Sequence, residues 1–311
     1  MLIGVGAPVS GSWATAANCR EIAELAEELG YHSLWTFQRL LSPVDADDRP
    51  VLDPQYRSVL DPVATLGFLA AVTDRVRLGV AVLNLPFLSP IAAAKQLGTI
   101  DVLSHGRLDC GFGTGWMPEE FEAVGAEIAG RGRRAEEFVT ALRALWSDGP
   151  VEHHGDLYSV PRSLVAPRPI QRPNPPILLG GTSEPALRRA GRLADGWISS
   201  SRVDPSEIGS SIAVIRAAAA EAGRDPGALR MVCRGVVRIT DTERRPLVGT
   251  VADVQADLEG LGEAGVDEVF VDLNFDPEVA SPDADPTSVM AYAREVLTGL
   301  APGSGWPGTS P

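Results

Sequence analysis

Two glycine-rich segments are the clearest candidates for chemistry, because each follows a short apolar run and precedes a helical pattern. They are residues 111–116, GFGTGW, and residues 180–183, GGTS. Glycine lets a ligand approach the backbone closely, and the N–H groups at the start of a helix attract anions. Either segment alone could be an ordinary tight turn. Together, after consecutive strands, they favour a phosphate-bearing cofactor.

The elements that must position these turns alternate regularly along the chain. Strands are predicted at residues 2–7, 32–37, 77–83, 107–112, 176–180, 196–199, 230–238 and 268–273. Amphipathic helices are predicted at residues 16–29, 62–73, 90–103, 131–146, 184–193, 205–222, 251–264 and 288–298. Eight strand–helix units without a hairpin signal predict an α/β fold, a (β/α)8 TIM barrel. Its site is expected in the loops at the carboxyl ends of the strands.

Two longer segments interrupt this rhythm as insertions. Residues 41–57 are polar and follow the second strand, and residues 151–175 are proline-rich and precede the fifth. A third, acidic segment at residues 276–286 looks like a loop. We predict one domain over residues 1–300 and a flexible tail over residues 301–311.

Composition excludes several classes of function. The formal net charge of −14 works against nucleic-acid binding and against an anionic membrane surface. No apolar stretch is long enough for a membrane span, and the first residues do not resemble a signal peptide. Cys19, Cys110 and Cys233 are far apart, which argues against a disulfide framework or a structural zinc. We therefore expect a cytoplasmic protein without a metal site.

Several motifs resemble those of the luciferase-like oxidoreductases and occur in the same order. They are AEELGYHSLW at residues 26–35, RLGVAVL at 77–83, LSHGRL at 103–108, RGRR at 131–134 and ADGW at 194–197. The pattern is most similar to the actinobacterial branch that uses the deazaflavin coenzyme F420. The resemblance implies F420 as cofactor, with FMN as the alternative, and a small-molecule substrate. Since the family often dimerises, a homodimer is one expectation.

The resemblance also assigns residues to the cofactor. In family members the third strand commonly ends in a bulge with a non-prolyl cis peptide beneath the ring, and the matching bond is Ala81–Val82. The two glycine-rich turns would hold the phosphate side. The implied cofactor-binding residues are Ala81, Val82, Gly113, Thr114, Gly115, Trp116, Gly180, Gly181, Thr182 and Ser183.

The residues that carry the chemistry in many relatives differ here. Where those members have an Asp-His or similar pair after the second strand, this chain has Gln38 and Arg39. Trp116 stands where relatives that oxidise sugar phosphates have a glutamate. Arginine cannot act as a base near neutral pH, so Arg39 either binds an anion or is an exposed loop residue. Gln38 either orients a carbonyl or lies on the surface. Both are candidate catalytic residues.

Other reactive side chains have structural interpretations. Cys110 alternates within a strand and is expected in the core, and His153 and His154 are expected in a solvated loop without a metal. Trp13 and Tyr56 either line the pocket or serve packing.

Three functions remain open. The first is hydride transfer between F420 and an organic substrate. The protein would orient the two reactants and exclude water from them. The second is an FMN-dependent monooxygenase that uses reduced flavin and oxygen. The third is a barrel that binds a flavin without catalysis.

Overall fold

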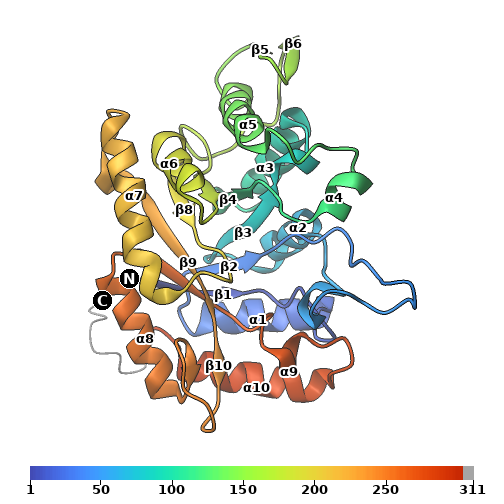
Figure 1. Ribbon diagram of the computed structural model, residues 1–311, viewed down its shortest axis with the longest axis vertical. Coiled ribbons are helices and arrows are strands. Elements are labelled where there is room, and N and C mark those ends of the chain that lie inside the picture. Colours follow the sequence, from blue (N-terminus) through green and yellow to red (C-terminus); the bar gives the residue numbers. More distant parts are fainter. Residues whose placement is uncertain (304–311) are drawn as a thin grey trace.

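The computed structural model describes residues 1–303, whose strands close into a barrel of eight parallel strands (Figure 1). The barrel strands are β1 (Leu2–Gly6), β2 (Ser33–Thr36), β3 (Arg77–Asn84), β4 (Leu108–Gly113), β7 (Ile177–Gly180), β8 (Gly196–Ile198), β9 (Arg230–Val236) and β12 (Glu268–Asp272). They are ordered β1-β12-β9-β8-β7-β4-β3-β2 around the barrel. The predicted (β/α)8 fold is confirmed. Residues 304–311, most of the predicted tail, lie outside the described part.

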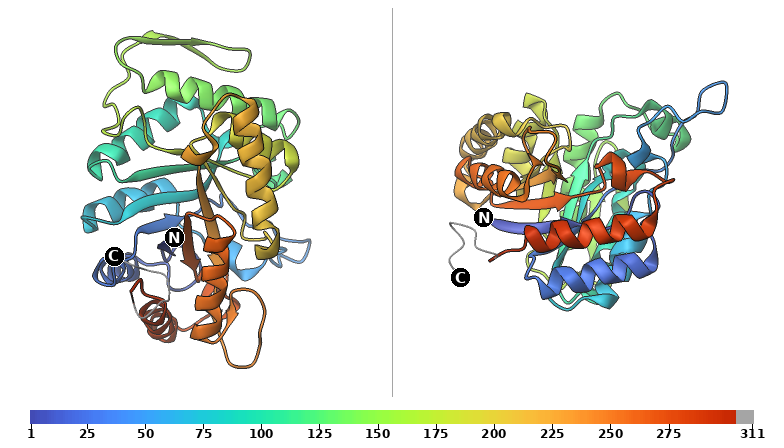
Figure 2. Two further views of the ribbon diagram at one scale, coloured as in Figure 1. Left: turned by 90° about the vertical axis from the view of Figure 1, so that its left-hand side faces the viewer. Right: turned by 90° about the horizontal axis from the view of Figure 1, so that it is seen from below.

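Helices surround the barrel, as the two views in Figure 2 show. They are α1 (Ala16–Glu28), α2 (Pro62–Val72), α3 (Pro90–Leu103), α4 (Pro118–Ala123), α5 (Arg131–Leu145), α6 (Glu184–Leu193), α7 (Ile208–Glu221), α8 (Val251–Glu263), α9 (Pro277–Ala280) and α10 (Pro286–Gly299). Asp61 caps α2 by accepting a hydrogen bond from the Ala64 N–H at 2.8 Å. Such a cap satisfies an N–H group that the helix itself leaves unpaired.

The structure corrects the sequence prediction in three places. Residues 276–286, expected as a loop, contain the short helix α9 and end at the first residue of α10. The insertion before β7 contains an antiparallel hairpin, β5 (Val151–His154) and β6 (Ser159–Ser163), although no hairpin was expected. The strand predicted at residues 230–238 is in fact two strands. The first, β9, belongs to the barrel, and the second, β10 (Arg238–Ile239), pairs with β11 (Val248–Gly249) outside the barrel. The apolar pattern continues across this division, so it could not reveal the change of partner.

Inside the barrel, large side chains pack against glycines. The Trp35 ring stacks on the Phe270 ring with their centroids 5.2 Å apart. A Cβ atom on Gly79 would lie 2.4 Å from the Trp35 ring, and one on Gly4 would lie 2.1 Å from Ser33 Oγ. Gly79 of β3 therefore makes room for the aromatic pair in the middle of the barrel, and Gly4 of β1 makes room for the Ser33 hydroxyl.

Gly79→Ala is expected to lower the free energy of unfolding by about 1–3 kcal/mol, because the added methyl group must displace the buried Trp35 ring. Urea denaturation followed by circular dichroism measures the change. Gly67→Ala in α2 is the matched control. A Cβ atom on Gly67 would have no other atom within 4 Å, and alanine is the better helix former, so this control should be stabilised. Equal destabilisation of both variants would contradict the packing argument.

Both ends of the barrel interior are charged. At the amino end, Asp109 of β4 binds Arg77 of β3 and Arg230 of β9, and Arg230 also binds Glu268 of β12. At the carboxyl end, Arg234 of β9 binds Asp272 of β12 at 2.5 Å. The carboxyl end opens into a cavity, whereas at the amino end the two carboxylates are fully buried and the two arginines are partly exposed.

Candidate functional site

A cavity of about 410 Å³ lies at the carboxyl ends of the barrel strands. It is lined by Phe37, Gln38, Arg39, Tyr56, Ala81, Val82, Asn84, Gly113, Thr114, Gly115, Trp116, Arg131, Gly180, Gly181, Thr182, Ser183, Ala186, Ile198, Ser199, Ser200, Ser201, Arg202 and Arg234. All twelve residues predicted for the site from the sequence are among them. The structure thus brings together segments that are far apart in the chain.

The turn at residues 180–183 leads into α6 and has the features of an anion site. Gly181 has a φ of +128°, a backbone conformation that side chains with a Cβ rarely adopt. Its carbonyl accepts a hydrogen bond from Trp197 Nε1 at 2.9 Å, which fixes the turn. Ser183 is the N-cap of α6, and its side chain makes no capping hydrogen bond. Within α6, Pro185 has no N–H and the Ala186 N–H donates to the Ser183 carbonyl at 2.8 Å, so the N–H groups left for an anionic ligand are those of Thr182, Ser183 and Glu184.

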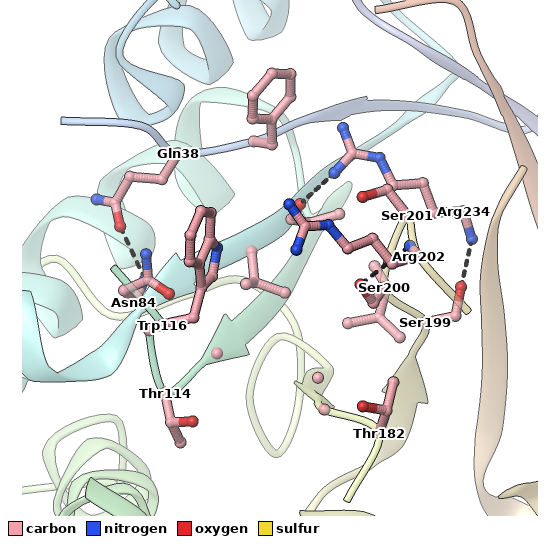
Figure 3. A pocket seen from close by; sticks show the side chains of 18 of the residues that line it. Gln38, Asn84, Thr114, Trp116, Thr182, Ser199, Ser200, Ser201, Arg202 and Arg234 are labelled. Carbon is pink, nitrogen blue, oxygen red and sulfur yellow. Dashed lines mark hydrogen bonds between the residues drawn. The ribbon is translucent and has the colours of Figure 1, made fainter. Parts of the chain in front are cut away.

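The second glycine-rich turn lies on the neighbouring strand β4. Gly115 has a φ of +73°, and a Cβ atom there would lie 2.8 Å from the Phe121 ring. Arg131 at the start of α5 donates a hydrogen bond to the Gly115 carbonyl at 3.0 Å. In Figure 3, Thr114 and Thr182 lie toward the same edge of the cavity, one from each turn. The two turns and Arg131 therefore form one polar end of the cavity.

The start of α5 carries positive charge where a helix normally prefers negative charge. Its first turn contains Arg131, Arg133 and Arg134 and no acidic residue, and its N-cap is Gly130, which has no side chain to cap the helix. Arg133 is paired with the exposed Asp156 at 3.5 Å. Cations at a helix N-terminus are disfavoured by the helix dipole. Arg134 lies beside Tyr158, and of the three arginines Arg131 lines the cavity, where an anion would offset its charge.

The floor of the cavity is the irregular end of β3. The Ala81–Val82 peptide bond is cis, as the family resemblance implied, and the register with β4 shifts between Val80 and Leu83. Gln38 Oε1 accepts a hydrogen bond from the Asn84 N–H at 2.9 Å, which joins β2 to this bulge (Figure 3). Gln38 is buried, so its surface alternative is wrong.

Arg39 is buried as well, with 9% of its surface exposed, so the exposed-loop alternative is also wrong. Its Nη1 pairs with Glu120 of α4 at 2.8 Å, and its guanidinium carbon lies 4.8 and 5.0 Å from the ring centroids of Tyr56 and Trp116, which contact each other edge to face. Burial lowers the pKa of Arg39 below its ordinary value, and the charge of Glu120 opposes that shift. The side chain stays protonated near neutral pH and cannot act as a base.

Two further arginines line the cavity and were missed by the sequence analysis. Arg234 projects from β9 and packs on the Phe37 and Phe275 rings at 4.7 and 4.1 Å. Arg202, in the loop after β8, lies 5.3 Å from the Trp116 ring centroid. An arginine inside an apolar strand was a signal that could have identified Arg234. Arg202 gave no such signal, because its loop is polar throughout.

The cavity lining contains no histidine, aspartate or glutamate. Cys110 is buried in β4, and burial raises its pKa well above the ordinary value, which confirms its core role. His153 and His154 lie in the β5–β6 hairpin, where each faces a glutamate. Trp13 is buried outside the cavity lining, whereas Tyr56 contributes to it. The arrangement can bind and orient a ligand, and among the lining residues it offers no carboxylate or imidazole base.

Within residues 1–303, no group of three His, Cys, Asp or Glu side chains could hold a metal ion. Over the same part of the chain, no helix has the length and apolar character needed to cross a membrane.

Comparisons with known proteins were made by sequence and by structure. A family model described as luciferase-like monooxygenase matches residues 2–247. An uncharacterised protein of Mycobacterium tuberculosis is 31% identical over 284 residues, which are 89% of this chain and 91% of that protein. An FMNH(2)-dependent dimethylsulfone monooxygenase of Pseudomonas putida is 34% identical over 235 residues, 75% of this chain and 60% of the relative. Among solved structures, an F420-dependent secondary alcohol dehydrogenase in complex with an F420-acetone adduct superposes with a TM-score of 0.77. The match covers 96% of this chain and 98% of that one at 17% identity, which shows that the two share a fold.

Proposed function

The chain belongs to the luciferase-like monooxygenase family, and on this premise we propose that it transfers a hydride between coenzyme F420 and a small organic substrate. Proteins similar to it use F420 or FMN, so the choice between the two must come from the residues of this site. The observation that carries our choice is the surplus of positive charge at the start of α5.

FMN ends at its phosphate, whereas F420 continues beyond its phosphate into a tail of carboxylates. Arg131 lines the cavity, whereas Arg133 and Arg134 follow it in the same helical turn outside the lining, where Arg133 pairs with Asp156 and Arg134 lies beside Tyr158. A phosphate alone needs one such cation together with backbone N–H groups of the turn before α6. The two further cations would attract the negative charges of a tail that leaves the cavity past Arg131. We therefore favour F420.

The residues present fit such a cofactor at both ends. The turns at Gly113–Gly115 and Gly180–Ser183, with Arg131, would hold the phosphate, and the bulge at Ala81 and Val82 would support the ring. When bound, F420 supplies or accepts a hydride at its ring. The protein binds and orients the reactants and excludes water from them. Gln38 contributes by fixing the backbone of Asn84 beside the bulge.

Arg131→Gln is expected to weaken F420 binding by about tenfold or more, because a charge-assisted hydrogen bond to phosphate contributes about 1.5–3 kcal/mol. Titration of the purified protein, followed by the fluorescence of the cofactor, measures the dissociation constant. Arg20→Gln is the matched control, since Arg20 lies on the exposed face of α1 and pairs only weakly with Glu24 at 3.9 Å. An unchanged dissociation constant for F420 in Arg131→Gln would show that Arg131 does not bind the cofactor.

The choice of cofactor is tested by titrating the protein with F420 and FMN in parallel, each oxidised and reduced. We expect tight binding of F420. The double variant Arg133→Gln/Arg134→Gln should weaken F420 binding several-fold and leave FMN binding unchanged, because only F420 extends past the phosphate. Tight binding of FMN without binding of F420 would overturn the proposal.

The second candidate is an FMNH2-dependent monooxygenase. Two observations favour it: the 34% identity to the Pseudomonas putida enzyme, and a cavity lining without histidine or carboxylate to move a proton. Oxygen consumption with reduced FMN and turnover with F420 under nitrogen separate the two candidates.

A further inference from the structure

The end of the cavity beyond the two glycine-rich turns combines cations with aromatic rings. Figure 3 shows Arg202 and Trp116 facing each other across this end, away from Thr114 and Thr182. Arg39, Tyr56 and Arg234 complete the lining there. If the glycine-rich turns hold the cofactor, as the proposed function states, this end is left for the substrate.

At this end of the cavity, two of the three arginines are neutralised by a carboxylate and one is not. Glu120 neutralises Arg39 at 2.8 Å, and Asp272 neutralises Arg234 at 2.5 Å, and neither carboxylate is part of the cavity lining. Within residues 1–303, no carboxylate lies within 4.0 Å of a nitrogen of Arg202. The Arg202 guanidinium instead lies against the exposed Trp116 ring. One positive charge therefore remains uncompensated at the substrate end.

Arg39 adds an unused donor to this surplus charge. Its Nε atom is buried and has no hydrogen-bond partner, although its Nη1 is paired with Glu120. A buried N–H group without an acceptor is costly, so native proteins rarely leave one. Because Arg39 lines the cavity, a small shift of its side chain would bring this covered N–H to an acceptor oxygen of a ligand there. The rings of Tyr56 and Trp116, which both contact Arg39 and meet edge to face, offer an apolar surface for the body of the same ligand.

We propose that the substrate is a small organic acid, whose anionic group binds Arg202 and the unpaired donor of Arg39 and whose apolar body packs on Trp116 and Tyr56. The proposal rests on the proposed function for the location of the cofactor. One surplus cation matches one negative charge, so a monoanion is favoured over a dianion or a neutral molecule.

The test compares matched probes on protein saturated with F420, so that the phosphate site is already occupied. The probes are benzoate against benzamide and phenylacetate against phenylacetamide. Binding is followed by the change in the absorption spectrum of the bound cofactor. We expect each acid to bind about tenfold more tightly than its amide, as one charge-assisted interaction would provide.

Variants assign the preference to particular residues. Arg202→Gln should remove the preference for the acid while F420 affinity stays within about twofold of wild type, because one rim cation contributes little to a ligand held elsewhere. Arg39→Lys keeps a positive charge beside Glu120 but loses the Nε donor, and it should weaken the acid selectively. Arg131→Gln should have the opposite effect: it should lower the affinity for F420. Once enough F420 is added to saturate this variant, it should still bind the acid more tightly than the amide.

Two kinds of failure are distinguishable. In the first, F420 binds, but the acids bind no better than the amides or neither type of probe binds. The proposed substrate class is then wrong and the cofactor proposal stands. If F420 does not bind, the proposed function fails. The same probes are then measured on the unloaded protein by calorimetry, where an acid preference lost in Arg202→Gln would support the anion site and its absence would overturn it.

Discussion

Asp109→Ala is expected to lower the free energy of unfolding by about 3–5 kcal/mol, a large part of the stability of an ordinary domain. Asp109 is fully buried at the amino end of the barrel. It accepts hydrogen bonds from Arg77 Nη2 at 2.6 Å and from Arg230 Nη2 at 2.9 Å. Removing it leaves two guanidinium groups without a shared partner inside the barrel. Urea denaturation followed by circular dichroism measures the loss.

The matched control removes an acidic partner on the surface. Glu221→Ala breaks the pair with Arg188, whose two side chains are largely solvated, and should cost less than about 1 kcal/mol. A loss of similar size in both variants would mean that burial does not determine the effect. Activity need not change in either variant, because both sites lie away from the cavity lining.

The same carboxylate gives a pH dependence with a definite sign. Burial alone would raise the pKa of Asp109, but hydrogen bonds and charges from Arg77 and Arg230 outweigh it and hold the pKa below the ordinary value. A carboxylate with a lowered pKa stabilises the folded state above the unfolded pKa, and this contribution is lost as the pH falls through the folded pKa. The stability difference between wild type and Asp109→Asn should therefore be constant above about pH 5 and shrink below it. A difference that grows on acidification would contradict this ionisation.

Gly181→Val is expected to weaken cofactor binding about 100-fold, equivalent to about 2.7 kcal/mol. The φ of +128° is unfavourable for a branched residue, and even a Cβ atom would lie 2.6 Å from Ala186 Cβ. The turn must change shape, and the N–H groups of Thr182 and Ser183, which have no partner within residues 1–303, would be displaced from the proposed anion site. Losing two charge-assisted hydrogen bonds accounts for an effect of this size.

A fluorescence titration measures this effect, and a thermal melt separates it from unfolding. The melting temperature should fall by only a few degrees, because the turn lies at the mouth of the barrel. Gly209→Ala in α7 is the control, since a Cβ atom there would have no neighbour closer than 3.9 Å and the residue is not part of the cavity lining. Retention of wild-type affinity in Gly181→Val would exclude this turn as the phosphate site.

The sequence alone determined the barrel and the two glycine-rich turns. The alternation of strands and helices is local, and each turn is encoded within a few residues. In a parallel barrel all such turns meet at one end, so Gly113 and Gly181 could be predicted to lie in the same site. The domain boundary at residue 300 and the homodimer stay predictions.

The charge balance of the site was decided by the tertiary structure. Sequence alternation indicates whether a strand residue faces inward, but it does not say which residue of another strand lies opposite. The pairs Arg39–Glu120, Arg234–Asp272 and Arg202–Trp116 form only when the barrel closes. The first two neutralise their arginines, and the third leaves Arg202 uncompensated. The sequence thus placed the two glycine-rich turns, whereas closure of the barrel determined which arginine has no carboxylate partner in the described part of the chain.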